Sequence, residues 1–112
     1  MKIYHNPRCR KSRETLQRIE EAGKSPDIIK YLETPPTEEE LEGLLRKLNL
    51  RAPELIRKGE KIYKEQFKGQ DLSEKEWIKV MAEHPKLIER PIVVDGERAI
   101  IGRPPENVDA LL

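Results

Sequence analysis

The residues with the clearest chemical potential lie around Cys9, the only cysteine among the 112 residues. Four cations lie within four residues of this thiol: Arg8, Arg10, Lys11 and Arg13. A free thiol with a pKa of about 8.5 is mostly protonated at neutral pH, but cations and a helix N-terminus lower that pKa to roughly 3.5–7.5. The pattern therefore predicts a reactive thiolate. The alternative is a small buried side chain without chemistry, the commoner state of a lone cysteine.

The expected secondary structure puts Cys9 at a junction between a strand and a helix. Ile3 and Tyr4 are typical of a first strand, and residues 10–23 have the apolar spacing of a helix. The first N–H groups of a helix lack partners within the helix, and that end of the helix dipole is positive. The same N–H groups can hold an oxyanion. We therefore expect a thiolate beside an anion pocket.

Strand and helix signals alternate in the rest of the chain. Residues 27–32 have the composition of a second strand, so the first helix joins two parallel strands in a βαβ unit. Residues 92–94 and 98–101 predict an antiparallel hairpin with Asp95-Gly96 at its turn. A last helix follows Arg103 and is expected to bury its apolar residues, which are Val108, Leu111 and Leu112.

The middle of the chain is expected to be helical. Thr37 with Glu40 and Ser73 with Glu76 have the spacing of capping boxes that begin helices. Four leucines after Thr37 have the spacing of one apolar helix face: Leu41, Leu44, Leu45 and Leu48. Asn49 is predicted to end the first of these helices and His84-Pro85 the second, with short helical pieces at residues 52–59 and 62–67 between them.

This order of elements predicts a single α/β domain over residues 1–112. A β-α-β unit, a helical insertion between the second and third strands and a β-β-α unit make the plan of a thioredoxin-like fold. Such folds carry a cysteine at the N-terminus of the first helix, facing a cis-proline that precedes the third strand. Pro91 occupies that position here.

Composition excludes several classes of function. Lys and Arg number 22 against 21 Asp and Glu, so a dedicated nucleic-acid binder, which needs a basic excess, is disfavoured. A single cysteine cannot form an intramolecular disulfide. His5 and His84 have no ligand spacing with each other or with Cys9, so no metal site is expected. Without an apolar targeting or membrane segment, a cytoplasmic monomer is the expectation.

Several stretches, taken together and in this order, resemble one known family nearly from end to end. They are Tyr4-His5-Asn6-Pro7-Arg8-Cys9, Tyr31-Leu32-Glu33-Thr34-Pro35-Pro36-Thr37, His84-Pro85, Arg90-Pro91-Ile92-Val93-Val94 and Gly102-Arg103-Pro104. With Arg57, they resemble the glutaredoxin-coupled arsenate reductase family. The resemblance implies that Cys9 attacks arsenate and that three arginines bind the oxyanion, namely Arg57, Arg90 and Arg103. It implies supporting places for His5, Asn6 and Pro91. Ser12, three residues after Cys9, is also a supporting candidate and is expected to contribute to the helix start or to anion contacts.

The resemblance also implies how the enzyme would be reduced. Because the chain has no second cysteine, an adduct on Cys9 requires an external thiol. The family implies glutathione, followed by glutaredoxin, as co-substrates, with no bound cofactor.

Arg10-Lys11 departs from the arsenate reductases of the family, which carry glycine and threonine after the cysteine. These two cations resemble a sister branch, and they keep open a glutathione-dependent thiol reductase without arsenate specificity. A third possibility is a regulator that binds RNA polymerase, as a relative of the family does. Ser12 stands where a C-x-x-C pair has its second cysteine, which counts against a redox-switched regulator. A cysteine phosphatase is disfavoured because its C-x5-R motif would need arginine at Thr15.

Overall fold

The computed structural model describes residues 1–112, which divide into two compact units. Unit 1 comprises Met1–Thr34 and Arg90–Leu112, and unit 2 comprises Pro35–Glu89. Unit 2 coincides with the helical insertion predicted from the sequence. The organisation of residues 1–112 as one domain stays a prediction.

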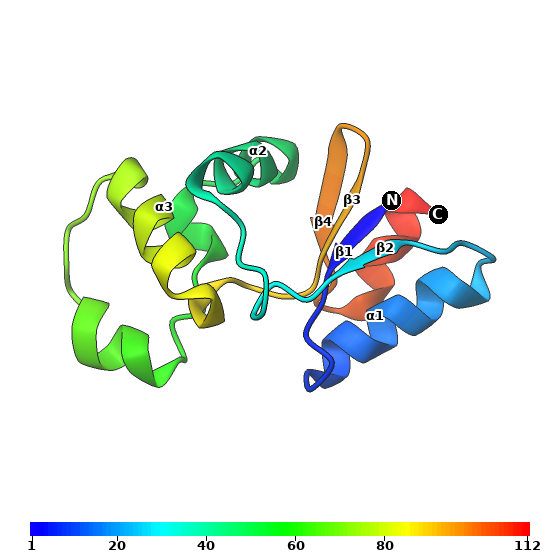
Figure 1. The fold of residues 1–112 in the computed structure, drawn as a ribbon, viewed down its shortest axis with the longest axis horizontal. Helices are drawn as coiled ribbons and strands as arrows, with labels where there is room; N and C mark the ends of the chain where they lie inside the picture. Colours follow the sequence, from blue (N-terminus) through cyan, green and yellow to red (C-terminus); the bar gives the residue numbers. More distant parts are fainter. The chain divides into compact units, whose positions relative to one another are not determined.

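Unit 1 is built on a four-stranded sheet in the order β2-β1-β3-β4. Its elements are β1 (Lys2–Tyr4), α1 (Arg10–Glu21), β2 (Asp27–Ile29), β3 (Ile92–Asp95), β4 (Arg98–Ile101) and a 3-10 helix, η4 (Pro105–Leu111) (Figure 1). β1 and β2 are parallel, whereas β1 with β3 and β3 with β4 are antiparallel. The predicted β-α-β and β-β-α order is confirmed.

The core of unit 1 forms where α1 and η4 pack together beside the sheet. Ile3 and Val93 are neighbours in the register of β1 and β3, and both are fully buried. The other buried members of this cluster are Ile19 from α1 and Val108 and Leu111 from η4. Burial of a large aliphatic side chain contributes about 1.5–3 kcal/mol, so this cluster is what fixes α1 against the strands.

The second strand is shorter than predicted. β2 ends at Ile29 because the carbonyl of Lys30 accepts hydrogen bonds from the N–H groups of Glu33 and Thr34, both at 2.9 Å, which closes a turn. Tyr31, predicted in the strand, lies in this turn and is 1% exposed.

Two details at the C-terminal end of unit 1 also differ from the prediction. Asp95 pairs with Arg98 within the hairpin, so the two turn residues are Gly96 and Glu97 rather than Asp95 and Gly96. Gly96 has φ +63°, a left-handed conformation that favours glycine, at the first turn position. Leu112, predicted to be buried, is 40% exposed because η4 ends at Leu111.

Unit 2 is helical. Its elements are α2 (Glu38–Leu48), η1 (Ala52–Leu55), η2 (Tyr63–Phe67), α3 (Glu74–Glu83) and η3 (Pro85–Leu87). Leu41, Leu44 and Leu45 of α2 are buried, as the spacing predicted, whereas Leu48 is half-buried. The helix expected over residues 52–59 is only the four residues of η1, because Ile56 is extended and pairs with Ile88 in an isolated bridge.

Both predicted capping boxes are present. Thr37 Oγ1 accepts the backbone N–H of Glu40 at 3.1 Å, and Glu40 Oε1 accepts the backbone N–H of Thr37 at 3.4 Å. Ser73 and Glu76 form the same pair of hydrogen bonds at 3.1 and 2.9 Å at the start of α3. Asn49 ends α2 in the left-handed conformation with φ 57°. Local sequence therefore sets the ends of these helices.

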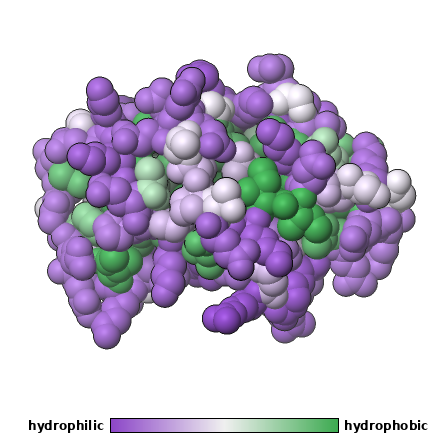
Figure 2. All heavy atoms as spheres, viewed as in Figure 1, coloured by the Kyte–Doolittle hydropathy of each residue, from purple (hydrophilic) through white to green (hydrophobic).

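Hydrophilic side chains cover most of the face shown in Figure 2, as expected for a chain with 38% charged residues. The helices are all too short or too polar to cross a membrane.

We expect Thr37→Ala to lower the free energy of unfolding by about 1 kcal/mol, because the first turn of α2 loses a cap for an unpaired N–H group. Chemical denaturation monitored by circular dichroism measures the change. Thr34→Ala is the matched control, since Thr34 is exposed and lies outside any helix, and it should shift stability by less than about 0.5 kcal/mol. Equal losses for both variants would contradict the capping role.

Candidate functional site

The sheet register brings three segments distant in sequence to one end of unit 1. Tyr4, the last residue of β1, pairs with Ile92, the first of β3, and Ile92 pairs with Ile101, the last of β4. The segments that extend from this row are the loop before α1, the segment before β3 and the segment after β4. They carry Cys9, Arg90 and Arg103, respectively.

The loop that follows β1 places Cys9 at the start of α1. Cys9 is the N-cap residue, with extended backbone angles of φ −92° and ψ 121°. The loop is held by hydrogen bonds to Asn6, whose carbonyl accepts the N–H of Cys9 and whose Oδ1 accepts the N–H of Arg8, both at 3.0 Å. Asn6 is buried and Cys9 is half-buried, so the thiol is accessible on a fixed backbone.

Burial of Cys9 opposes ionisation, yet the surrounding groups outweigh it and hold the pKa of the thiol below its ordinary value. The groups that lower this pKa are the backbone N–H of Ser12, the guanidinium of Arg90, through both a hydrogen bond and its charge, and the backbone N–H of Lys11. Lys11 and Ser12 are the second and third residues of α1, so their N–H groups have no partners within the helix. The arrangement favours a thiolate.

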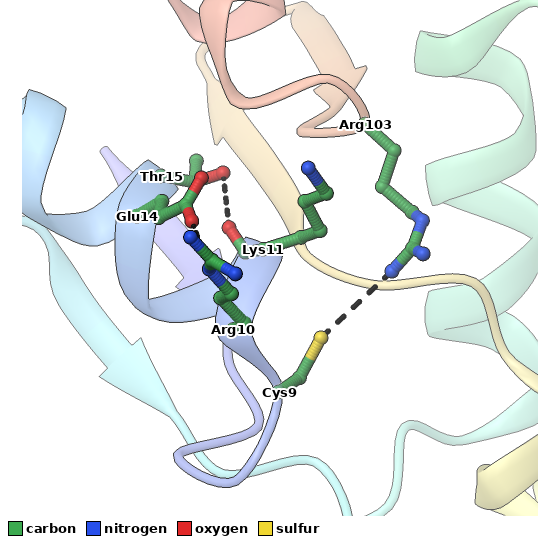
Figure 3. A network of polar contacts seen from close by, with 6 residues as sticks. All are labelled: Cys9, Arg10, Lys11, Glu14, Thr15 and Arg103. Atoms are coloured by element: carbon green, nitrogen blue, oxygen red, sulfur yellow. Dashed lines mark hydrogen bonds and ion pairs between the residues drawn. The ribbon is translucent and has the colours of Figure 1, made fainter.

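Two arginines approach Cys9 from the other two segments. Arg103 donates from Nη1 to Cys9 Sγ at 3.8 Å, a long contact from an exposed side chain (Figure 3). Arg90 is half-buried and is the cation that lowers the pKa of Cys9, so its contact is the stronger influence on ionisation. The Arg90–Pro91 peptide is cis, as predicted from the position of Pro91, and the Arg103–Pro104 peptide is cis as well.

The expected source of positive charge was partly wrong. Arg10, which directly follows Cys9, points to Glu14, with Nε 2.8 Å from Oε1 and an 82% exposed side chain (Figure 3). Arg13 donates to the carbonyl of Pro7 at 3.0 Å. Side-chain charges next to Cys9 in sequence therefore do not account for its lowered pKa, whereas Arg90 and the helix N–H groups do. The i,i+4 spacing of Arg10 and Glu14 was the signal available for this pairing.

His5 and Ser12 form a buried polar network behind the loop. Ser12 Oγ accepts the N–H of Asn6 at 3.0 Å and lies 2.6 Å from Nδ1 of His5. The Ser12 hydroxyl proton is then available for Nδ1, and this assignment from the network leaves the His5 proton on Nε2. Burial, followed by the charges of Lys30 and Arg13, lowers the pKa of His5 below 6.5. His5 is therefore neutral at pH 7 and supports the loop without adding charge.

Arg57 belongs to unit 2. Its N–H donates to the carbonyl of Leu87 at 2.7 Å, next to the bridge between Ile56 and Ile88. Its guanidinium lies 3.8 Å from the carboxylate of Glu60 and 3.5 Å from that of Glu89. Within unit 2 the side chain is thus positioned by two carboxylates, and its role in binding an anion stays a prediction.

No group of three or more His, Cys, Asp and Glu residues is arranged to hold a metal ion. The chemistry available at this end of unit 1 is that of one activated thiolate beside two guanidinium groups. A thiolate attacks electrophiles, and guanidinium groups bind oxyanions through paired N–H donors.

We expect Arg90→Gln to raise the pKa of Cys9 and to slow alkylation by iodoacetamide at pH 7 by roughly fivefold, the effect of losing one nearby charge in a solvent-accessible site. Ultraviolet absorbance of the thiolate during a pH titration measures the pKa. Arg10→Gln is the matched control and should leave the titration unchanged, because Arg10 is turned toward Glu14. A larger shift for Arg10→Gln than for Arg90→Gln would refute this assignment of the charge.

Known proteins of one family are similar to this chain over nearly its whole length. The sequence profile of the ArsC family matches residues 4–111. An arsenate reductase of Neisseria meningitidis serogroup A is 41% identical over 114 residues, which cover 100% of this chain and 97% of the relative. "Uncharacterized protein YfgD" of Escherichia coli K12 is 51% identical over 110 residues, covering 96% of this chain and 92% of the relative. The solved structure of an arsenate reductase from Vibrio cholerae has a TM-score of 0.95 and 51% identity, with 99% of this chain and 96% of the other covered. The chain therefore belongs to the ArsC family and has its thioredoxin-like fold.

Proposed function

We propose that this protein is a thiol-dependent arsenate reductase in which Cys9 is the nucleophile. The observation that carries the proposal is the lowered pKa of Cys9 beside two arginines, Arg90 and Arg103. The similarity to arsenate reductases along the full chain supports arsenate as the substrate. A tetrahedral oxyanion fits a site made of guanidinium groups and the N–H groups of a helix N-terminus.

The arginines have a defined task in this proposal. Arsenate and a thiolate are both anions, so attack requires that their repulsion be offset. Arg90 and Arg103 each present a planar fork of N–H donors with a permanent charge, which a lysine does not offer. Arg57 is proposed as the third oxyanion ligand on the strength of the family resemblance, and the network of His5, Asn6 and Ser12 as the support that fixes the loop of Cys9.

The proposed reaction proceeds in two thiol steps. The Cys9 thiolate attacks the arsenic atom, an As–S bond forms, and one As–O bond breaks with the oxygen leaving as water after protonation. An external thiolate then attacks the sulfur of Cys9, an S–S bond forms, and the As–S bond breaks with its electron pair remaining on arsenic. The two sulfurs supply the two electrons that convert arsenate to arsenite, and a mixed disulfide on Cys9 is the oxidised product. A further thiol restores Cys9 by exchange.

The external reductant is proposed to be glutathione, with glutaredoxin resolving the mixed disulfide. The chain has one cysteine, so it cannot resolve the mixed disulfide by itself. We further propose that the protein acts as a cytoplasmic monomer without a bound cofactor. These proposals come from the family resemblance and from the need for a second sulfur.

A glutathione-dependent thiol reductase without arsenate specificity is the second candidate. Arg10 and Lys11 replace the small residues found after the cysteine in arsenate reductases of the family, and both side chains are exposed. Such an enzyme would reduce mixed disulfides of glutathione through the same thiolate. The two functions differ in whether arsenate stimulates turnover.

We expect Cys9→Ser to reduce arsenate-dependent turnover to background while leaving the fold intact, since the residue is half-buried at a helix start. The assay couples arsenate reduction to NADPH oxidation through glutathione, glutaredoxin and glutathione reductase, and circular dichroism checks the fold. Ser25→Ala, at an exposed position outside any helix or strand, is the control. Turnover retained by Cys9→Ser would contradict the mechanism. A wild-type protein that reduces a glutathione mixed disulfide but not arsenate would establish the second candidate.

We expect Arg90→Lys to lower kcat/KM for arsenate by about 10²–10³, the usual loss when one donor to developing charge is removed. Lysine keeps the charge, so the pKa of Cys9 should stay below its ordinary value. The combination of a retained pKa and a lost rate separates the paired donors from the charge. Arg46→Lys on the exposed face of α2 serves as the control. A near-normal rate for Arg90→Lys would rule out the arginine clamp.

A further inference from the structure

One contact inside unit 1 joins all three segments that carry the site. Thr15, on the second turn of α1, is fully buried, and its Oγ1 donates to the carbonyl of Lys11 at 2.8 Å (Figure 3). The carbonyl of Gly102, 3.3 Å from Oγ1, shares the same hydroxyl proton. The N–H of Gly102 in turn donates to the carbonyl of Pro91 at 2.9 Å. Helix α1, the segment before β3 and the end of β4 thus meet at Thr15, Pro91 and Gly102.

The contact is too close for any side chain at position 102. A Cβ atom built on Gly102 would lie 2.8 Å from Pro91 Cγ and 2.9 Å from Thr15 Cγ2, and it would also overlap Thr15 Oγ1. Real Cβ atoms essentially never approach other atoms this closely. Glycine is required here for space rather than for backbone conformation, and it lets the end of β4 lie directly against α1 and Pro91.

Each partner in this contact is next to a group that faces Cys9. Lys11, whose carbonyl accepts from Thr15, supplies one of the N–H groups that favour the thiolate. Pro91 follows Arg90, and Gly102 precedes Arg103. A shift at the contact would therefore move the helix N-terminus and both guanidinium groups relative to the sulfur.

We propose that Thr15 is a positioning residue of this site, whose hydroxyl holds Arg103 and the first turn of α1 in register about Cys9. The inference rests on the proposed function only where it concerns the rate of arsenate reduction. The positions of Arg103 and α1 relative to the thiol can be tested without arsenate. A threonine hydroxyl that bonds to the carbonyl four residues earlier is common in helices. The second acceptor, on another element, is what makes this hydroxyl a link between segments.

The test uses a charge-sensitive probe that does not need arsenate. Iodoacetate is an anion and iodoacetamide is neutral, so the ratio of their reaction rates with Cys9 reports the positive groups held near the sulfur. Arg103→Gln should lower this ratio by roughly fivefold, as expected for one charge about 4 Å away in a wet site. Thr15→Val, which keeps the shape and removes the hydroxyl, should lower the ratio to a similar extent.

The decisive measurement is a double-mutant cycle between Thr15→Val and Arg103→Gln. If Thr15 holds Arg103 in place, the second substitution adds little to the first, and the combined ratio stays near that of either single variant. Thr15→Ser keeps the hydroxyl and should retain the wild-type ratio, whereas Thr34→Val, at an exposed threonine of the same unit, should change nothing. Additive effects, or a Thr15→Ser protein that behaves as Thr15→Val does, would overturn the proposal.

A second variant keeps the test valid should Thr15→Val not fold. Gly102→Ala pushes apart the same three segments and should also lower the ratio of the two rates. In the Gly102→Ala protein, Arg103→Gln should then lower that ratio little further. An unchanged ratio in folded Gly102→Ala would likewise overturn the proposal. Arsenate turnover is measured in parallel. A wild-type protein that does not turn over arsenate refutes the proposed function alone. Normal turnover together with additive effects of Thr15→Val and Arg103→Gln refutes the positioning role alone.

Discussion

The interaction on which the site depends is that between the sulfur of Cys9 and the first N–H groups of α1. Burial alone would make this thiol harder to ionise, and the opposite outcome requires donors that cannot turn away. Backbone N–H groups at a helix start meet that requirement because the helix itself fixes their direction. Ser12 and Lys11 provide two of them, and Arg90 adds a cation from another part of the chain. Cys9 sits just outside the helix, where its side chain can reach those donors.

The sheet fixes the positions of Arg90 and Arg103 relative to Cys9, as helix α1 fixes the N–H groups that face the thiol. The row formed by Tyr4, Ile92 and Ile101 crosses three strands, and the flanking segments leave that row on the same side of unit 1. A slip of one residue between β3 and β4 would turn alternate side chains to the opposite face and remove Arg103 from the sulfur. The buried pair of Ile3 and Val93 resists such a slip between β1 and β3. The geometry at the thiol therefore depends on core packing between two residues, Ile3 and Val93, that are far apart in the sequence.

Local patterns in the sequence predicted local structure well. The capping residues Thr37 and Ser73 begin their helices as expected, and the place of Cys9 before α1 follows from the composition on each side.

The charge near Cys9 was harder to predict, because the sequence shows which residues are neighbours along the chain but not where their side chains point. Arg10 is adjacent to the thiol yet turns to Glu14, whereas Arg90 is distant in sequence and reaches the thiol through strand register. Only the family resemblance, and no local pattern, indicates Arg90 and Arg103 in the sequence. The hairpin turn lies one residue later than predicted, because Asp95 continues the ladder opposite Arg98 and Gly96 takes the left-handed conformation at the first turn position.

Ser12 shows how one substitution separates this site from a dithiol site. In a C-x-x-C arrangement a second sulfur would stand at this position and could form a disulfide with the first. A hydroxyl cannot, but it can accept the N–H of Asn6 and donate to His5, which no thiol does as well. Because His5 is neutral, this network adds no charge beside the thiol. The hydroxyl of Ser12 thus fixes the shape of the loop, but the site has no second sulfur that could form a disulfide with Cys9. In the proposed reaction an oxidised Cys9 is therefore reduced by a thiol from outside the chain, and this step requires the accessible position that Cys9 has.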